Sequence, residues 1–181
     1  LDFDAIQMLW ILRRMRDEGI YLDGRKMKSP PKLFLGSAAS PFASEPKFQA
    51  LREEKKINAG AQFFQTNLIF DPDGLDLWLE ALDKRNILDK VYILAGVTPI
   101  RSNRMVQYLH YNIPGVTVPK EILNRFEAAK EDDYEEVGVE IALEIIEKIK
   151  PKQGINGLHL MSVGWEAIVP RIISEAGLLV N

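Results

Sequence analysis

Short runs of small and polar residues follow the predicted β-strands of this sequence, and such runs can bind a flat organic molecule. They are Ala38-Ala39-Ser40, Thr66-Asn67, the stretch from Thr98 to Asn103, and Ser162-Val163-Gly164. Where side chains are short, a ligand can approach the backbone closely. The alternative interpretation is that these residues only make tight turns. The residue types alone do not decide between the two.

The stretch from Ala59 to Asp71 shows most clearly how such a run is positioned. Gly60 can take the left-handed conformation that ends a helix, and Phe63 and Phe64 suit a buried, pleated surface. Thr66-Asn67 stands where the strand should reach the surface. This stretch therefore predicts one βα repeat, and chemistry in such repeats lies at the carboxyl end of the strand.

Hydrophobic periodicity predicts the same alternation along the whole chain. Strands are expected at 32–37, 62–66, 91–95 and 157–161, and helices from Asp4 to Gly19, at 47–59, 75–82, 105–109, 119–126, 134–149 and 165–176. This alternation favours a parallel sheet of the α/β class, either doubly wound or part of a (β/α)8 TIM barrel. A complete barrel needs roughly 250 residues. The 181 residues, taken as one domain (1–181), would form about half of a barrel.

Composition argues against several function classes. The 23 basic and 26 acidic residues give a net charge of -3, which offers no electrostatic footprint for nucleic acid or anionic lipid. No apolar run approaches the roughly 20 residues that cross a bilayer, so we expect no membrane partner and a cytoplasmic location. The chain has no cysteine and only two histidines, His110 and His159, so we expect no metal site.

Several segments, in the right order, resemble the methylenetetrahydrofolate reductase family. The segment from Ala59 to Asn67 resembles the family strand A-G-A-x-x-x-x-T-Q, with Asn67 in place of the usual glutamine. Further matches are Lys55 to Ala61 for K-V-x-A-G-A, Ala95 to Ile100 for P-G-I-x-P-I, Gly157-Leu158-His159 for G-L-H, Gly36 to Pro41, and Val118-Pro119. Together they cover essentially the whole chain.

The resemblance implies a flavin-binding (β/α)8 barrel that reduces 5,10-methylenetetrahydrofolate to 5-methyltetrahydrofolate, with this chain as its second half. In the family, the catalytic acid and the charge-stabilising group come from the first half, so no catalytic residue is carried over. The resemblance places Ala39, Ser40 and Lys56 along the flavin, with FAD favoured over FMN, and Asn67 against the pterin. Asparagine keeps the donor and the acceptor of glutamine but is shorter.

Two departures from the nicotinamide-using members concern the electron donor. Trp165 stands where those members have arginine, and Met105 replaces a polar substrate-contacting residue. We include both as candidate substrate-binding residues. The segment from Leu160 to Glu166 resembles the anaerobic branch, which draws electrons from a partner subunit, so we expect an oligomer or complex. The alternatives are a pterin-binding barrel methyltransferase and a non-catalytic, partner-binding subunit.

Overall fold

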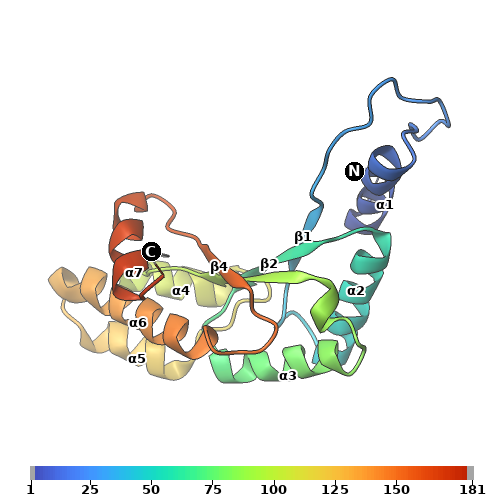
Figure 1. Cartoon of the computed structure of the whole chain (residues 1–181). Helices are drawn as coiled ribbons and strands as arrows, with labels where there is room; N and C mark the ends of the chain where they lie inside the picture. Colours follow the sequence, from blue (N-terminus) through green and yellow to red (C-terminus); the bar gives the residue numbers. More distant parts are fainter. Residues whose placement is uncertain (1–2, 179–181) are drawn as a thin grey trace.

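The computed structural model describes residues 3–178 and has an α/β fold built on one parallel sheet (Figure 1). The strands are β1 (Gly36–Ala39), β2 (Phe63–Leu68), β3 (Tyr92–Val97) and β4 (Gly157–Leu160). The α-helices are α1 (Ala5–Asp17), α2 (Pro46–Ala59), α3 (Pro72–Asp83), α4 (Asn103–Asn112), α5 (Lys120–Ala128), α6 (Tyr134–Ile149) and α7 (Val169–Glu175). Short 3-10 helices lie at Leu88–Lys90, Glu131–Asp133 and Glu166–Ile168. The strands are hydrogen-bonded in chain order, β1-β2-β3-β4.

The helices cover one face of the sheet. Figure 1 shows α3, α5 and α6 along this face. The strand side chains that point toward the helices are buried. Phe64 and Ile93 are inaccessible to solvent there, as is Trp78 of α3. Because neighbouring residues of a strand point to opposite faces, Phe63 and Tyr92 belong to the other face. The buried core therefore lies between the sheet and its helices.

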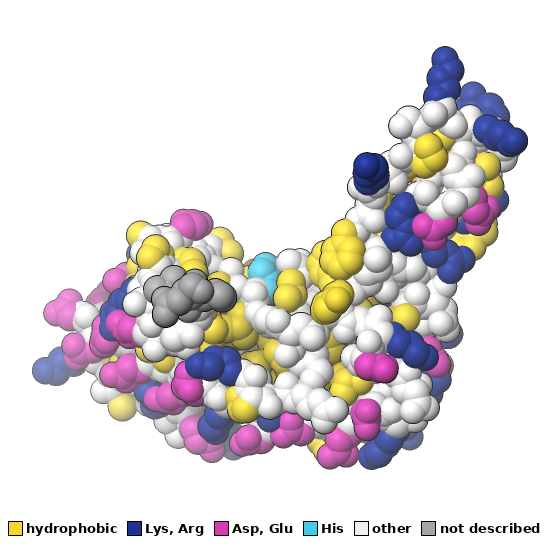
Figure 2. Space-filling view, viewed as in Figure 1, with side chains coloured by type: hydrophobic (Ala, Val, Ile, Leu, Met, Phe, Trp, Pro, Cys, Tyr) yellow, Lys and Arg dark blue, Asp and Glu magenta, His cyan; other side chains and the backbone are white. Residues whose placement is uncertain are grey.

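The other face of the sheet is not crossed by any helix within residues 3–178 (Figure 1). Figure 2 shows hydrophobic side chains on this side, between the projecting N-terminal part of the chain, which contains α1, and the last helix, α7. Phe34 stacks on Phe63 with ring centroids 5.3 Å apart, and Tyr92 lies 6.4 Å from Phe34. Phe34 and Tyr92 remain 61% and 58% exposed. This uncovered apolar face is unusual for a parallel sheet, which is normally covered on both sides.

Two predicted element starts differ from the structure by four residues, each for a local reason. The first strand begins at Gly36 and not at Lys32, because the Gln62 side chain, not a strand, accepts the Leu35 N–H at 3.1 Å. The last helix begins at Val169 and not at Trp165. Pro170 has no N–H and would clash with the preceding turn of an α-helix, so the chain forms the 3-10 helix Glu166–Ile168 first.

The strand β2 is irregular at its carboxyl end. Its pairing register with β3 shifts between Gln65 and Leu68. In the gap, the Thr66 hydroxyl accepts a hydrogen bond from the Gly96 N–H at 2.8 Å. Irregularities of this kind re-aim side chains and are common next to active sites. Here the shift lies at Asn67, the residue that the sequence places in the substrate site.

Candidate functional site

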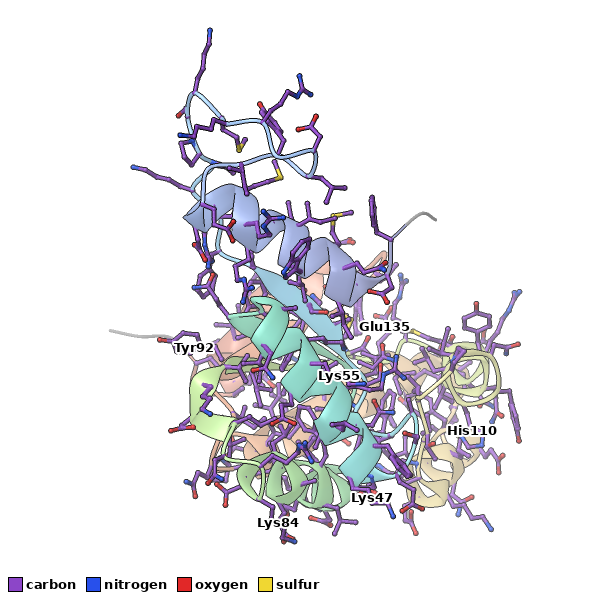
Figure 3. All side chains as sticks on the ribbon, turned by 90° about the vertical axis from the view of Figure 1, so that its right-hand side faces the viewer. Lys47, Lys55, Lys84, Tyr92, His110 and Glu135 are labelled. Atoms are coloured by element: carbon purple, nitrogen blue, oxygen red, sulfur yellow. The ribbon has the colours of Figure 1, made fainter. Side chains whose placement is uncertain are left out.

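The candidate residues lie at the carboxyl ends of four neighbouring strands. Figure 3 shows the direction of the sheet: Tyr92, the first residue of β3, lies on one side of the molecule, and His110, on the helix that follows β3, lies on the other. Candidates from the second side are Ala39 and Ser40 at the end of β1, Asn67 at the end of β2, Met105 in the first turn of α4, and Trp165 in the loop after β4. Lys56 lies in the last turn of α2 and reaches β1 through its ammonium. Parallel strands thus bring together residues far apart in the sequence.

The end of β1 is organised around Lys56. Its ammonium donates a hydrogen bond to the Ala38 carbonyl at 2.7 Å and lies 2.9 Å from Glu53 Oε2. It also lies 5.7 Å from the centre of the Phe64 ring. The Ala39 side chain is buried in the core, whereas Ser40 is half-buried. Ala39 could therefore meet a ligand only through its backbone.

Glu53 is a buried carboxylate that the sequence did not point to. Its side chain is 0% exposed, and neither oxygen accepts a hydrogen bond of good geometry within residues 3–178. Burial raises the pKa of the Glu53 carboxyl, and the Lys56 ammonium offsets only part of this effect. A charged side chain without full compensation is costly inside a protein. It therefore requires an explanation beyond packing.

Asn67 keeps most of its hydrogen-bonding capacity. Its Nδ2 donates one long hydrogen bond, 3.4 Å, to the Pro114 carbonyl in the loop after α4. No residue within the described part of the chain donates to its side-chain oxygen. The half-buried amide can therefore still offer a donor and an acceptor to a ligand.

The loops after β3 and β4 are tied together. Thr98 Oγ1 donates to the Met161 carbonyl at 2.6 Å, and Arg101 Nη1 donates to the Gly164 carbonyl at 2.8 Å. The Arg101 guanidinium also lies 5.6 Å from the centre of the Trp165 ring, within range of a cation–π interaction. These contacts fix the half-buried Trp165 beside the end of β3. The sequence did not single out Arg101 for this role.

The two histidines lie in separate surroundings. His110 lies in the last turn of α4 and its Nδ1 accepts the Val118 N–H at 3.3 Å. His159 pairs in register with Gly96, and its buried Nδ1 has no partner within the described residues. In residues 3–178, no group of three or more metal-binding side chains is found. Helices long and apolar enough to cross a membrane are also absent from this part of the chain.

The structure brings the candidates to one edge of the sheet, but in separate groups. Lys56 belongs with β1, Asn67 with the Pro114 loop, and Trp165 with Arg101. Met105 is half-buried near its helix start, where its N–H is capped by the Ser102 hydroxyl at 3.1 Å. Such an edge offers backbone groups, one amide, one ammonium and one aromatic ring, which suits a large flat ligand with polar edges.

Comparisons with known proteins identify the family of this chain. The model of the methylenetetrahydrofolate reductase family matches residues 38–177. Methylenetetrahydrofolate reductase 2 of Schizosaccharomyces pombe is 29% identical over 131 residues, which are 69% of this chain and 20% of that protein. Methylenetetrahydrofolate reductase 1 of the same yeast is 28% identical over 127 residues, covering 68% and 20%. The chain thus spans about a fifth of the length of these curated relatives.

A solved structure shares the fold. It is an uncharacterized protein from Clostridium thermocellum that binds two copies of 5-methyl-5,6,7,8-tetrahydrofolic acid. The TM-score is 0.61 at 18% identity, over 93% of this chain and 70% of that one. The structural similarity supports the α/β fold, and the family match covers all the candidate residues at the sheet edge. The chain belongs to the methylenetetrahydrofolate reductase family.

Proposed function

We propose that this chain is the second half of a flavin-binding (β/α)8 barrel that reduces 5,10-methylenetetrahydrofolate to 5-methyltetrahydrofolate in the cytoplasm. The observation that carries the proposal is the convergence of the family-matched residues at the carboxyl edge of the sheet, within the matched span 38–177. Membership of the family rests on the match over residues 38–177 and does not depend on this convergence.

The strand order supports the barrel interpretation. The described strands follow one another as β1-β2-β3-β4, as consecutive barrel strands do, whereas a doubly wound sheet reverses its order at a switch point. The uncovered apolar face with Phe34, Phe63 and Tyr92 would then be part of the barrel interior. The other strands and the catalytic acid would come from a first half, as the family resemblance implies.

The end of β1 fits a flavin. Exposed Ala38 and half-buried Ser40 are small, so a ring system can lie against the backbone there. The Lys56 ammonium donates a hydrogen bond to the Ala38 carbonyl and forms an ion pair with Glu53, and an ammonium has three N–H donors, so at least one donor remains for a cofactor. When bound, the flavin supplies the hydride that reduces the methylene carbon. Lys56, Ser40 and the Ala39 backbone would hold and orient it.

The ends of β2, β3 and β4 would bind the folate. Asn67 offers its amide to the pterin edge, and Trp165, fixed by Arg101, offers an aromatic surface for stacking. Met105 adds a half-buried apolar side chain at the start of α4. Because Met105 and Trp165 give few polar contacts for nicotinamide, we infer that a partner subunit supplies the electrons.

Asn67→Ala tests the folate part of the site in the complete protein that contains this chain. We expect kcat/KM for the folate to fall about tenfold to a hundredfold, because a buried amide partner is worth about 1–3 kcal/mol. Flavin retention should change less, since Lys56 and β1 are untouched. Gln153→Ala is the matched control, since Gln153 is an exposed amide in the loop before β4, at the opposite edge of the sheet. An unchanged kcat/KM in Asn67→Ala would remove Asn67 from the substrate site.

A further inference from the structure

The Glu53 carboxylate is the least explained charge in the described structure. It is 0% exposed on a helix face that also buries Gln49, Ala50 and Ala59. An apolar side chain of similar size would fill the same space without the cost of burying a charge. Its position therefore points to a function in relation to its nearest charged neighbour.

That neighbour is Lys56, one helical turn further along α2. The Lys56 Nζ lies 2.9 Å from Glu53 Oε2, and the Lys56 side chain is only 12% exposed. On α2 the charged groups that act on this pair are its own two members and Arg52. From the strands, Lys56 meets the Ala38 carbonyl and the Phe64 ring, neither of which titrates. Glu53 is thus the only anion in contact with the ammonium within residues 3–178.

We propose that Glu53 is a positioning residue that keeps Lys56 charged and fixed at the end of β1, so that a free N–H of its ammonium faces the flavin. This inference rests on the proposed flavin site. The Ala38 carbonyl and Glu53 restrain the ammonium from two directions. Without the carboxylate, the partly buried ammonium loses the anion that offsets the cost of its burial, because burial disfavours the charged form.

The test compares Glu53→Gln, Lys56→Met and the double variant in the complete protein, with circular dichroism to confirm folding. The dissociation constants of FAD and FMN are measured by fluorescence between about pH 7 and pH 9, the range in which a buried lysine without its counter-charge can titrate. We expect wild-type affinity to stay constant across this range. Glu53→Gln should weaken binding about tenfold at the alkaline end only, as expected for the loss of one charged contact.

The other variants separate positioning from a structural role. Lys56→Met should bind flavin weakly at every pH, and adding Glu53→Gln to it should change nothing further, because Glu53 would act only through Lys56. If Glu53 merely supported the fold, Glu53→Gln would lower affinity equally at every pH and would still do so in the Lys56→Met background. Either result would overturn the inference.

A measurement without flavin distinguishes this inference from the proposed function. In protein labelled with nitrogen-15 lysine, the Lys56 ammonium signal should persist at alkaline pH in the wild type and be lost earlier in Glu53→Gln. If the protein binds flavin but Glu53→Gln does not change the pH at which the Lys56 ammonium signal is lost, the inference is wrong and the proposed function stands. If Glu53→Gln does change this pH but the complete protein binds no flavin, the proposed function is wrong, and so is the flavin role of Glu53 and Lys56.

Discussion

Gly138→Ala is expected to destabilise the chain by about 3 kcal/mol, the upper part of the range for overpacking a core. Gly138 lies in α6, where the helix touches the loop that follows β3. A Cβ atom at this position would overlap the Ile100 carbonyl oxygen and lie 2.7 Å from the Ile100 carbonyl carbon. The obstacle is backbone, so no side-chain rotation can relieve it.

The sign of this effect makes it a sharp test. In an ordinary helix interior, replacing glycine by alanine stabilises by about 1 kcal/mol. Here we expect the midpoint of thermal unfolding to fall by roughly 6–12 °C, given the usual 2–4 °C per kcal/mol for a domain of this size. Glu140→Ala is the control on the same helix, because Glu140 is exposed and its ion pair with Arg125 is at the surface. A Gly138→Ala variant as stable as the wild type would show that α6 does not pack this closely against the Ile100 backbone.

The same variant should also affect the site. Ile100 directly precedes Arg101, whose guanidinium contacts the Gly164 carbonyl and the Trp165 ring. Displacing the loop would therefore move Trp165. We expect weaker folate binding in any Gly138→Ala protein that remains folded.

The second large effect concerns the electron donor. In the complete protein, we expect NADH alone to reduce the flavin about a hundredfold more slowly than 5-methyltetrahydrofolate does. A pocket that presents apolar surface in place of hydrogen-bonding groups discriminates against a polar ligand by about this factor. Met105 and Trp165 are the residues responsible, and the Arg101 guanidinium next to Trp165 already contacts Glu135 and Gly164.

Anaerobic stopped-flow absorption measures both rates. Dithionite serves as the control that the flavin is reducible, and Trp165→Phe, which keeps an apolar ring, should leave the NADH reaction slow. Fast, saturable bleaching by NADH alone would contradict the partner-donor proposal. It would also place the chain with the nicotinamide-using members of the family.

The elements of the fold were predictable because each has a strong local signal. The apolar spacing of α6 predicted the helix 134–149, and its observed bounds, Tyr134–Ile149, confirm it. Asp4 caps α1 through a reciprocal bond with Gln7, a local pattern that fixes the helix start. The start of β1 was not predictable in this way, because it depends on the Gln62 side chain, 27 residues away from Leu35.

The site was only partly predictable for a similar reason. Strand order brings Ser40, Asn67 and Trp165 to one edge, and the alternation of strands and helices was enough to expect this. Glu53 and Arg101 were missed because their roles arise from tertiary contacts. A signal for Glu53 existed: it follows Gln49 and Ala50 at helical spacing on the buried side of α2, where a carboxylate is out of place. No comparable local signal marks Arg101.

The most direct test of the proposed function is a visible absorption spectrum of the complete protein, recorded anaerobically before and after adding 5-methyltetrahydrofolate. We predict that the purified protein shows the absorption bands of a bound flavin. We also predict that 5-methyltetrahydrofolate bleaches them, because its methyl group returns a hydride to the flavin and becomes the methylene of 5,10-methylenetetrahydrofolate. A colourless protein, or flavin bands that 5-methyltetrahydrofolate leaves unchanged, would contradict the proposal that this chain is part of a flavin-dependent folate reductase.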